Sequence, residues 1–152
     1  MATFRAALTA LAALDVPGVA HNYDLSTVPD QLTRSQLPAL LVLPGEVNER
    51  RLFQEHGTGF QTLAFSGGAR SISYAVTHLL LVAPTADGVG LRSHLPCLID
   101  LIDAYFAALA EDVTLGGVLL EPAKVTVEPG VFTHGDAVFH GCALRHLWII
   151  KL

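Results

Sequence analysis

The last sixteen residues of the chain, Ala137 to Leu152, form an alternating segment, and this segment constrains the fold most. Successive side chains of a β-strand point to opposite faces, so alternation over this length predicts one long strand within a sheet. One face of that strand carries Val138, His140, Cys142, Leu144, His146, Trp148 and Ile150.

Shorter apolar runs, bounded by proline and glycine, predict further strands. Gly67 and Gly68 supply the positive φ of a tight turn, so the runs on either side of them are expected to form a hairpin. The expected strands besides the last are 19–23, 37–45, 60–66, 71–83, 118–120 and 124–128.

Two segments carry apolar residues at steps of three and four, the period of a helix packed along one face. They are Ala2–Leu14, which Pro17 and Gly18 follow, and the longer Leu91–Glu111. The order of elements predicts an α+β (mixed α/β) fold with a single sheet on which an N-terminal helix and one long helix pack. A length of 152 residues fits one domain, residues 1–152.

The composition points to assembly. Hydrophobic residues make up 51% of the chain and charged residues 15%, where average domains have about 25% charged residues. So little polar surface favours an oligomer that buries part of each subunit. The net charge of −5 with nine basic residues argues against an extensive nucleic-acid-binding face. No run approaches 18 uninterrupted apolar residues, so we expect no membrane span.

A metal site on the last strand is the most specific chemical alternative. His140, Cys142 and His146 share one face, and His134 lies just upstream. Imidazole and thiolate bind zinc. However, six residues of extended strand span about 20 Å, so one ion can take His140 and Cys142 but not His146. Ordinary packing is favoured, and a small metal- or ligand-binding domain stays open as an alternative.

The motifs of common enzymes are missing from the sequence. It has no Gly-x-Ser-x-Gly elbow, and its glycine-rich stretches lack the lysine of a phosphate-binding loop. Asp100 and Asp103 lie on the long helix, where such pairs more often mark its solvated side. We therefore expect no enzyme activity, no catalytic residues, no bound metal and no cofactor.

The whole-chain pattern resembles a known family. A helix leads to the strand Leu37-Pro38-Ala39-Leu40-Leu41-Val42-Leu43-Pro44, followed by a charged loop and a hairpin. The long helix and a final strand holding Gly141 come after them, with Leu115-Gly116-Gly117 and Gly135 between. This order and apolar spacing resemble the tail terminator (tail completion) proteins of long-tailed bacteriophages, which cap the tail tube and join it to the head.

The resemblance implies a structural virion protein of the phage tail or neck, present in the host cytoplasm during assembly. It implies a homo-oligomer, a hexameric ring, whose partners are the tail-tube protein and the head–tail connector proteins. DNA would pass through the pore without specific binding, and no membrane is involved. Another neck or head–tail joining component is the alternative within the same class.

Two loops are expected to carry the partner contacts, because exposed loops on a rigid scaffold are where binding usually occurs. They are the charged segment Glu46–Gly59 and the hairpin tip Ser66–Arg70. The predicted partner-binding residues are Glu46, Glu49, Arg50, Arg51, Glu55 and Arg70.

Overall fold

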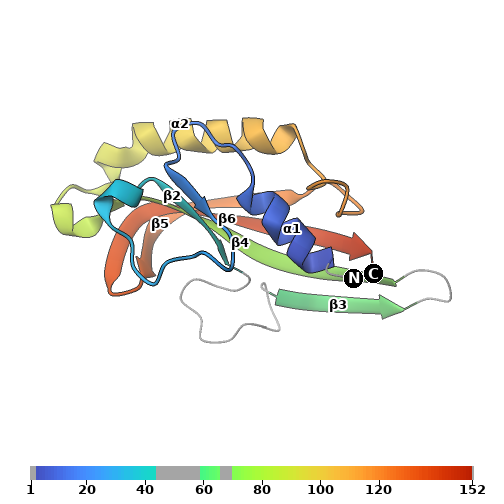
Figure 1. Cartoon of the computed structure of the whole chain (residues 1–152). Coiled ribbons are helices and arrows are strands. Elements are labelled where there is room, and N and C mark those ends of the chain that lie inside the picture. Colours follow the sequence, from blue (N-terminus) through green and yellow to red (C-terminus); the bar gives the residue numbers. More distant parts are fainter. Residues whose placement is uncertain (1–2, 44–58, 66–69, 152) are drawn as a thin grey trace.

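The computed structural model of the chain describes residues 3–43, 59–65 and 70–151 (Figure 1). Its helices are α1 (Thr3–Ala12) and α2 (Leu91–Ala110), with 3₁₀ turns at Arg34–Gln36 and Thr85–Asp87. Its strands are β1 (His21–Tyr23), β2 (Ala39–Leu43), β3 (Gly59–Phe65), β4 (Arg70–Pro84), β5 (Lys124–His134) and β6 (Ala137–Lys151). The predicted α+β class, with one sheet, an N-terminal helix and one long helix, is confirmed.

The sheet is mixed and has β4 and β6 at its centre. Its strand order is β1-β2-β4-β6-β5, and β3 also pairs with β4. Only the β1–β2 pair is parallel among the described strands. The strands β2 and β3 pair with successive parts of the same edge of β4, because Leu43 lies opposite Thr77 and Gly59 lies opposite Ala75.

The two central strands approach each other closely at Gly141 of β6. A Cβ atom added there would lie 2.0 Å from the carbonyl oxygen of Leu80 on β4. Only glycine fits at such a contact. The register of the β4–β6 pair shifts just beyond it, between Leu81 and Ala83, which is the pattern of a β-bulge.

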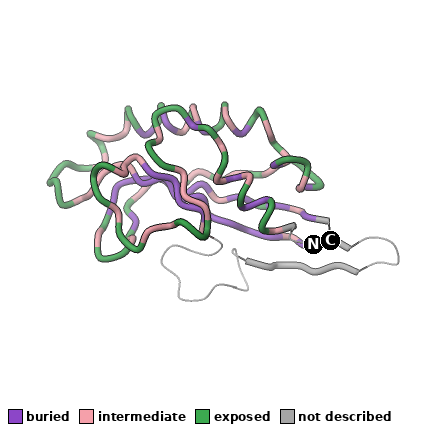
Figure 2. The backbone as a smooth tube through the Cα atoms, viewed as in Figure 1, coloured by how far each residue is buried: buried purple, intermediate pink, exposed green. Residues whose placement is uncertain are grey.

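Both helices pack on one face of the sheet and enclose the main core (Figures 1 and 2). Trp148 of β6 is fully buried there, and removing an aromatic side chain of this size from water contributes roughly 4–6 kcal/mol. The helices contribute Ala7, Leu8, Leu11, Leu98, Leu101, Tyr105 and Leu109.

The opposite face of the sheet is covered over only part of its area. A second cluster of buried side chains forms where the segment 23–37 crosses this face. Its buried members are Leu41, Leu79, Leu81, Phe132, Phe139 and Ala143.

Two of the expected strand boundaries are wrong. Residues 118–120 form no strand and contribute an isolated bridge between Leu119 and Ile150. The strand expected at 124–128 continues through Pro129 and Gly130 to His134. Proline is tolerated in edge strands, and β5 lies at one edge of this sheet.

Candidate functional site

Most of the residues predicted to bind partners lie outside the described part of the chain. Glu46, Glu49, Arg50, Arg51 and Glu55 all fall in 44–58. The backbone of Arg70 is described as the first residue of β4, opposite Phe65, but its side chain is not. Their role as partner contacts stays a prediction.

The described strands nevertheless fix where both predicted contact loops begin and end. The segment 44–58 leaves β2 at Leu43 and rejoins the sheet at Gly59, and the β4 partners of these two residues, Thr77 and Ala75, are two positions apart. The tip 66–69 connects the far ends of β3 and β4. The seven residues of β3 place the end of the first loop, at Gly59, about 20 Å from the start of the second, at Phe65.

Beyond the area covered by 23–37, the second sheet face is partly open to solvent. Its side chains mix polar and apolar groups, and Leu147 is 36% exposed. Arg145 crosses this face and donates from Nε to Glu128 Oε2 at 2.6 Å. We call the open sheet face the set Ser71, Ser73, Lys124, Thr126, Glu128, Arg145, Leu147 and Ile149.

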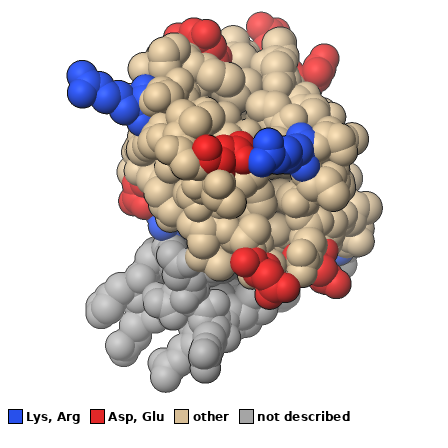
Figure 3. All heavy atoms as spheres, turned by 90° about the vertical axis from the view of Figure 1, so that its left-hand side faces the viewer, with Lys and Arg blue, Asp and Glu red and all other residues tan. Residues whose placement is uncertain are grey.

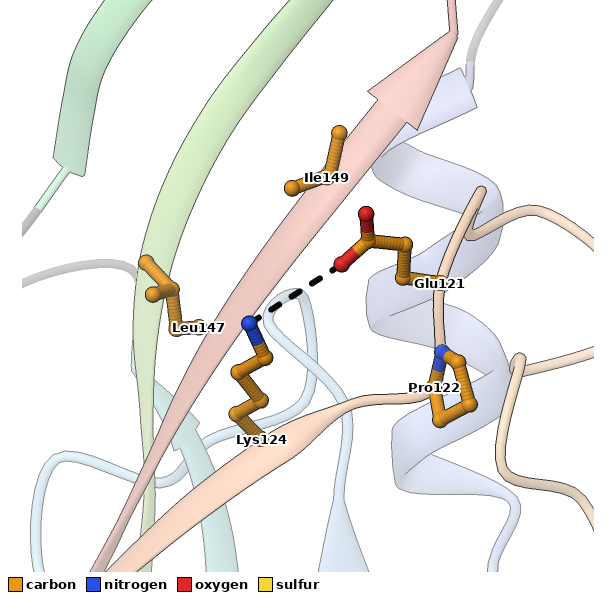
Figure 4. A pocket seen from close by; sticks show the side chains of 5 residues that line it. All are labelled: Glu121, Pro122, Lys124, Leu147 and Ile149. Carbon is orange, nitrogen blue, oxygen red and sulfur yellow. Dashed lines mark ion pairs between the residues drawn. The ribbon is translucent and has the colours of Figure 1, made fainter.

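A shallow hollow lies at the β5 edge of this open sheet face (Figure 4). It is lined by Glu121, Pro122, Lys124, Leu147 and Ile149, and Lys124 Nζ lies 3.9 Å from Glu121 Oε2. Its volume is about 10 Å³, far below the roughly 300–1,000 Å³ of small-molecule sites. The hollow is therefore too small for a small-molecule ligand.

The outer side of α2 is the second surface with exposed apolar groups. By length and composition alone, α2 could cross a membrane, but one side of it packs on the sheet. On the outer side Ile99 is 54% and Phe106 38% exposed, beside the exposed Asp100 and Asp103. The sequence assigned the two carboxylates to the solvated side of this helix, and the structure confirms that position.

A chain of hydrogen bonds crosses the core between the sheet and α2. His78 Nε2 lies 2.9 Å from Asn22 Oδ1, an acceptor, so Nε2 carries the proton of neutral His78. Trp148 Nε1 donates to His146 Nδ1 at 3.2 Å, so the proton of His146 is on Nε2, 2.6 Å from the Tyr105 oxygen. Tyr105 then donates its own proton to His78 Nδ1 at 2.8 Å. We call these five residues the buried histidine network.

The network also holds the end of α1. Asn22 donates from Nδ2 to the carbonyl oxygens of Leu11 and Leu14, each at 3.2 Å. The last carbonyls of a helix have no partner within the helix, so the amide of Asn22 satisfies part of this need. The network thus ties α1, β1, β4, β6 and α2 together.

Burial keeps the network uncharged. It lowers the pKa of His146 from 6.5 to about 3, and it lowers the pKa of His78 well below 6.5, with His146 as a second cause. Burial also raises the pKa of Tyr105 well above 10, with Cys142 as a second cause. Neutral rings match the donor and acceptor assignment above. This arrangement fits a structural role in stabilising the fold better than a proton-transfer site, because the polar side-chain groups of the network are all hydrogen-bonded to one another or to the backbone.

The candidate zinc ligands of the last strand have separate partners. His146 belongs to the network, and His134 Nε2 donates to the Pro29 carbonyl at 2.7 Å. His140 Nε2 donates to the Val89 carbonyl at 2.9 Å. Cys142 is buried, which raises its pKa to about 11 and keeps it a thiol at neutral pH. No group of three or more His, Cys, Asp or Glu side chains within the described ranges is placed to hold a metal ion.

Neither the protein-family models nor the curated proteins match the chain. The functional reading therefore rests on the sequence pattern and on the described surfaces.

Proposed function

We propose that the chain is a structural subunit of a phage tail, of the tail terminator type, that assembles into a ring capping the tail tube and joining it to the head connector. The observation that carries the proposal is a subunit surface rich in exposed apolar groups and poor in charge. On the face in Figure 3 the charged side chains are scattered, with wide uncharged areas between them.

The exposed apolar side chains lie on more than one side of the subunit. They include Ile99 and Phe106 on α2 and Leu147 on the open sheet face, on opposite sides of the sheet. A subunit that contacts two neighbours in a ring needs two different apolar surfaces, and closure of the ring ends the assembly. This is consistent with the low charge and with the element order from which the resemblance was drawn.

The predicted contact loops fit the same role. The segment 44–58 joins β2 to β3, which both pair with the central strand β4, and the tip 66–69 joins β3 to β4. Loops presented by a rigid sheet are suited to contacts with a tube below or a connector above. The other neck component that the sequence left open would use the same surfaces.

The proposal is tested by electron microscopy of the purified chain, alone and mixed with tail-tube protein. We expect rings with a central opening, and in the mixture we expect one ring at one end of each tube. Rings that never bind a tube end would point to the other neck component. Isolated particles of subunit size in both samples would overturn the ring itself.

A further inference from the structure

One ring nitrogen of His140 makes a hydrogen bond, and the other has no hydrogen-bond partner among the described residues. The residue is 6% exposed, and its Nε2 donates to the carbonyl oxygen of Val89. The neutral ring therefore keeps a lone pair on Nδ1. This Nδ1 is buried and has no hydrogen-bond partner among the described residues.

A second such nitrogen belongs to the neighbouring ring. His94 lies in the first turn of α2, and its ring centroid is 5.3 Å from that of His140, with an angle of 33° between the ring planes. His94 Nε2 is also buried without a hydrogen-bond partner in the described part of the chain. Buried polar atoms are almost always satisfied, so two orphaned nitrogens on adjacent rings call for a third group.

We propose that His94 Nε2 and His140 Nδ1 together bind one transition-metal cation of the Zn²⁺ class, with water completing its coordination. Neutral imidazole nitrogens are preferred ligands of such ions. Two imidazoles on one tetrahedral ion, with metal–nitrogen bonds of about 2.0–2.1 Å, have ring centroids about 5 Å apart. A ligating histidine usually donates its other ring N–H to a carbonyl or carboxylate, as His140 does to Val89.

The site is buried but lies close to the surface. Residues 88–90 are exposed beside it, and a Cβ atom added at Gly88 or Gly90 would meet no atom within 4 Å. The ion would connect the N-terminal turn of α2 to β6. The two histidines belong to different elements, so the ion would cross-link α2 and β6. This role does not depend on whether the subunits assemble into a ring.

An anion is the competing ligand, because the positive end of the α2 dipole lies nearby. The atoms without partners argue against it. Nδ1 of His140 carries a lone pair, because Nε2 of this ring donates to Val89, and a lone pair repels an anion. Coordination of a cation by two nitrogens is also stronger than the attraction of an anion to the α2 dipole, so the cation is favoured.

The test is calorimetric titration of the metal-free full chain with Zn²⁺, and its visible spectrum with Co²⁺. We expect one Zn²⁺ per chain in the wild type and at least a tenfold weaker binding in His94→Gln, which removes one of the two ligands and replaces a half-buried side chain. His21→Gln, at an exposed histidine, should bind as the wild type does. Thermal melts with and without Zn²⁺ should show a higher melting temperature only where the ion binds.

Four outcomes would overturn the proposal. One is a wild type that binds no Zn²⁺, which would mean that the orphaned nitrogens hold water. Another is equal binding by the wild type and His94→Gln. The third is binding abolished in Cys97→Ser, since Cys97 is an exposed free thiol one turn after His94 and would then be the ligand. Phosphate that raises the melting temperature more than Zn²⁺ does would favour the anion instead.

Discussion

Replacing Tyr105 by Phe tests the buried histidine network most sharply. The substitution removes one hydroxyl and leaves the ring, so almost no packing volume is lost. It leaves the lone pair of His78 Nδ1 and the N–H of His146 Nε2 without partners, both in the core. Each such orphan costs about 1–3 kcal/mol, so we expect a loss of about 2–6 kcal/mol. Domains are stable by only about 5–15 kcal/mol, so this is a large share.

The assay is equilibrium unfolding in urea, followed by tryptophan fluorescence, since Trp148 is itself a member of the network. With a slope of about 1–3 kcal/mol per M, a loss of 3 kcal/mol moves the midpoint by at least about 1 M. The matched control is Tyr23→Phe, which removes a single hydrogen bond from Gln36 Nε2 at 2.9 Å in a half-buried place. It should cost under about 1.5 kcal/mol. Equal and small losses of unfolding free energy in both variants would refute the stabilising role of the network.

Three further predictions concern pH, a close contact and the charged loop. Below about pH 6.5 the two network histidines are protonated in the unfolded chain but not in the folded chain. The free energy of unfolding should therefore fall by about 1.4 kcal/mol per histidine for each pH unit below 6.5, down to about pH 3 for His146. Equal urea midpoints at pH 7 and pH 5 would contradict this prediction. Gly141→Ala should destabilise the fold by about 3 kcal/mol or more, since its Cβ meets Leu80 at 2.0 Å, whereas Gly130→Ala directly opposite, with 3.8 Å of room, should change the urea midpoint little. Arg50→Glu combined with Arg51→Glu should weaken binding to tail-tube protein in co-sedimentation and leave the melting temperature unchanged; Arg92→Glu on α2 is the control, and unchanged binding by the double variant would remove the charged loop from the interface.

Periodicity predicted most of the fold because burial imposes it. The predicted bounds of both helices and of the two central strands β4 and β6 agree with the structure within a few residues, since each of these elements has one side against the core. The extension of β5 beyond Pro129 was missed, because the sequence does not show that this strand is the sheet edge, where proline is tolerated. The strand predicted at 118–120 failed for a different reason. Its apolar residues make a single bridge instead of a ladder.

Side-chain partners could be predicted less well from the sequence. The shared face of Cys142 and His146 follows from alternation alone, and the structure places both in the helix-side core. That His146 meets Tyr105, and that His140 meets His94, depends on how α2 lies across the sheet. The two members of these pairs are 41 and 46 residues apart in the sequence, and no periodic pattern predicts contacts between residues so far apart.

The central claim is that the chain assembles into a closed ring, and the native mass in solution tests it most directly. Light scattering at several protein concentrations should show a stable species near six times the subunit mass of 16.2 kDa, about 97 kDa. A mass that grows without limit as the concentration rises would contradict closure. A 16.2 kDa monomer at every concentration, with and without tail-tube protein, would contradict assembly.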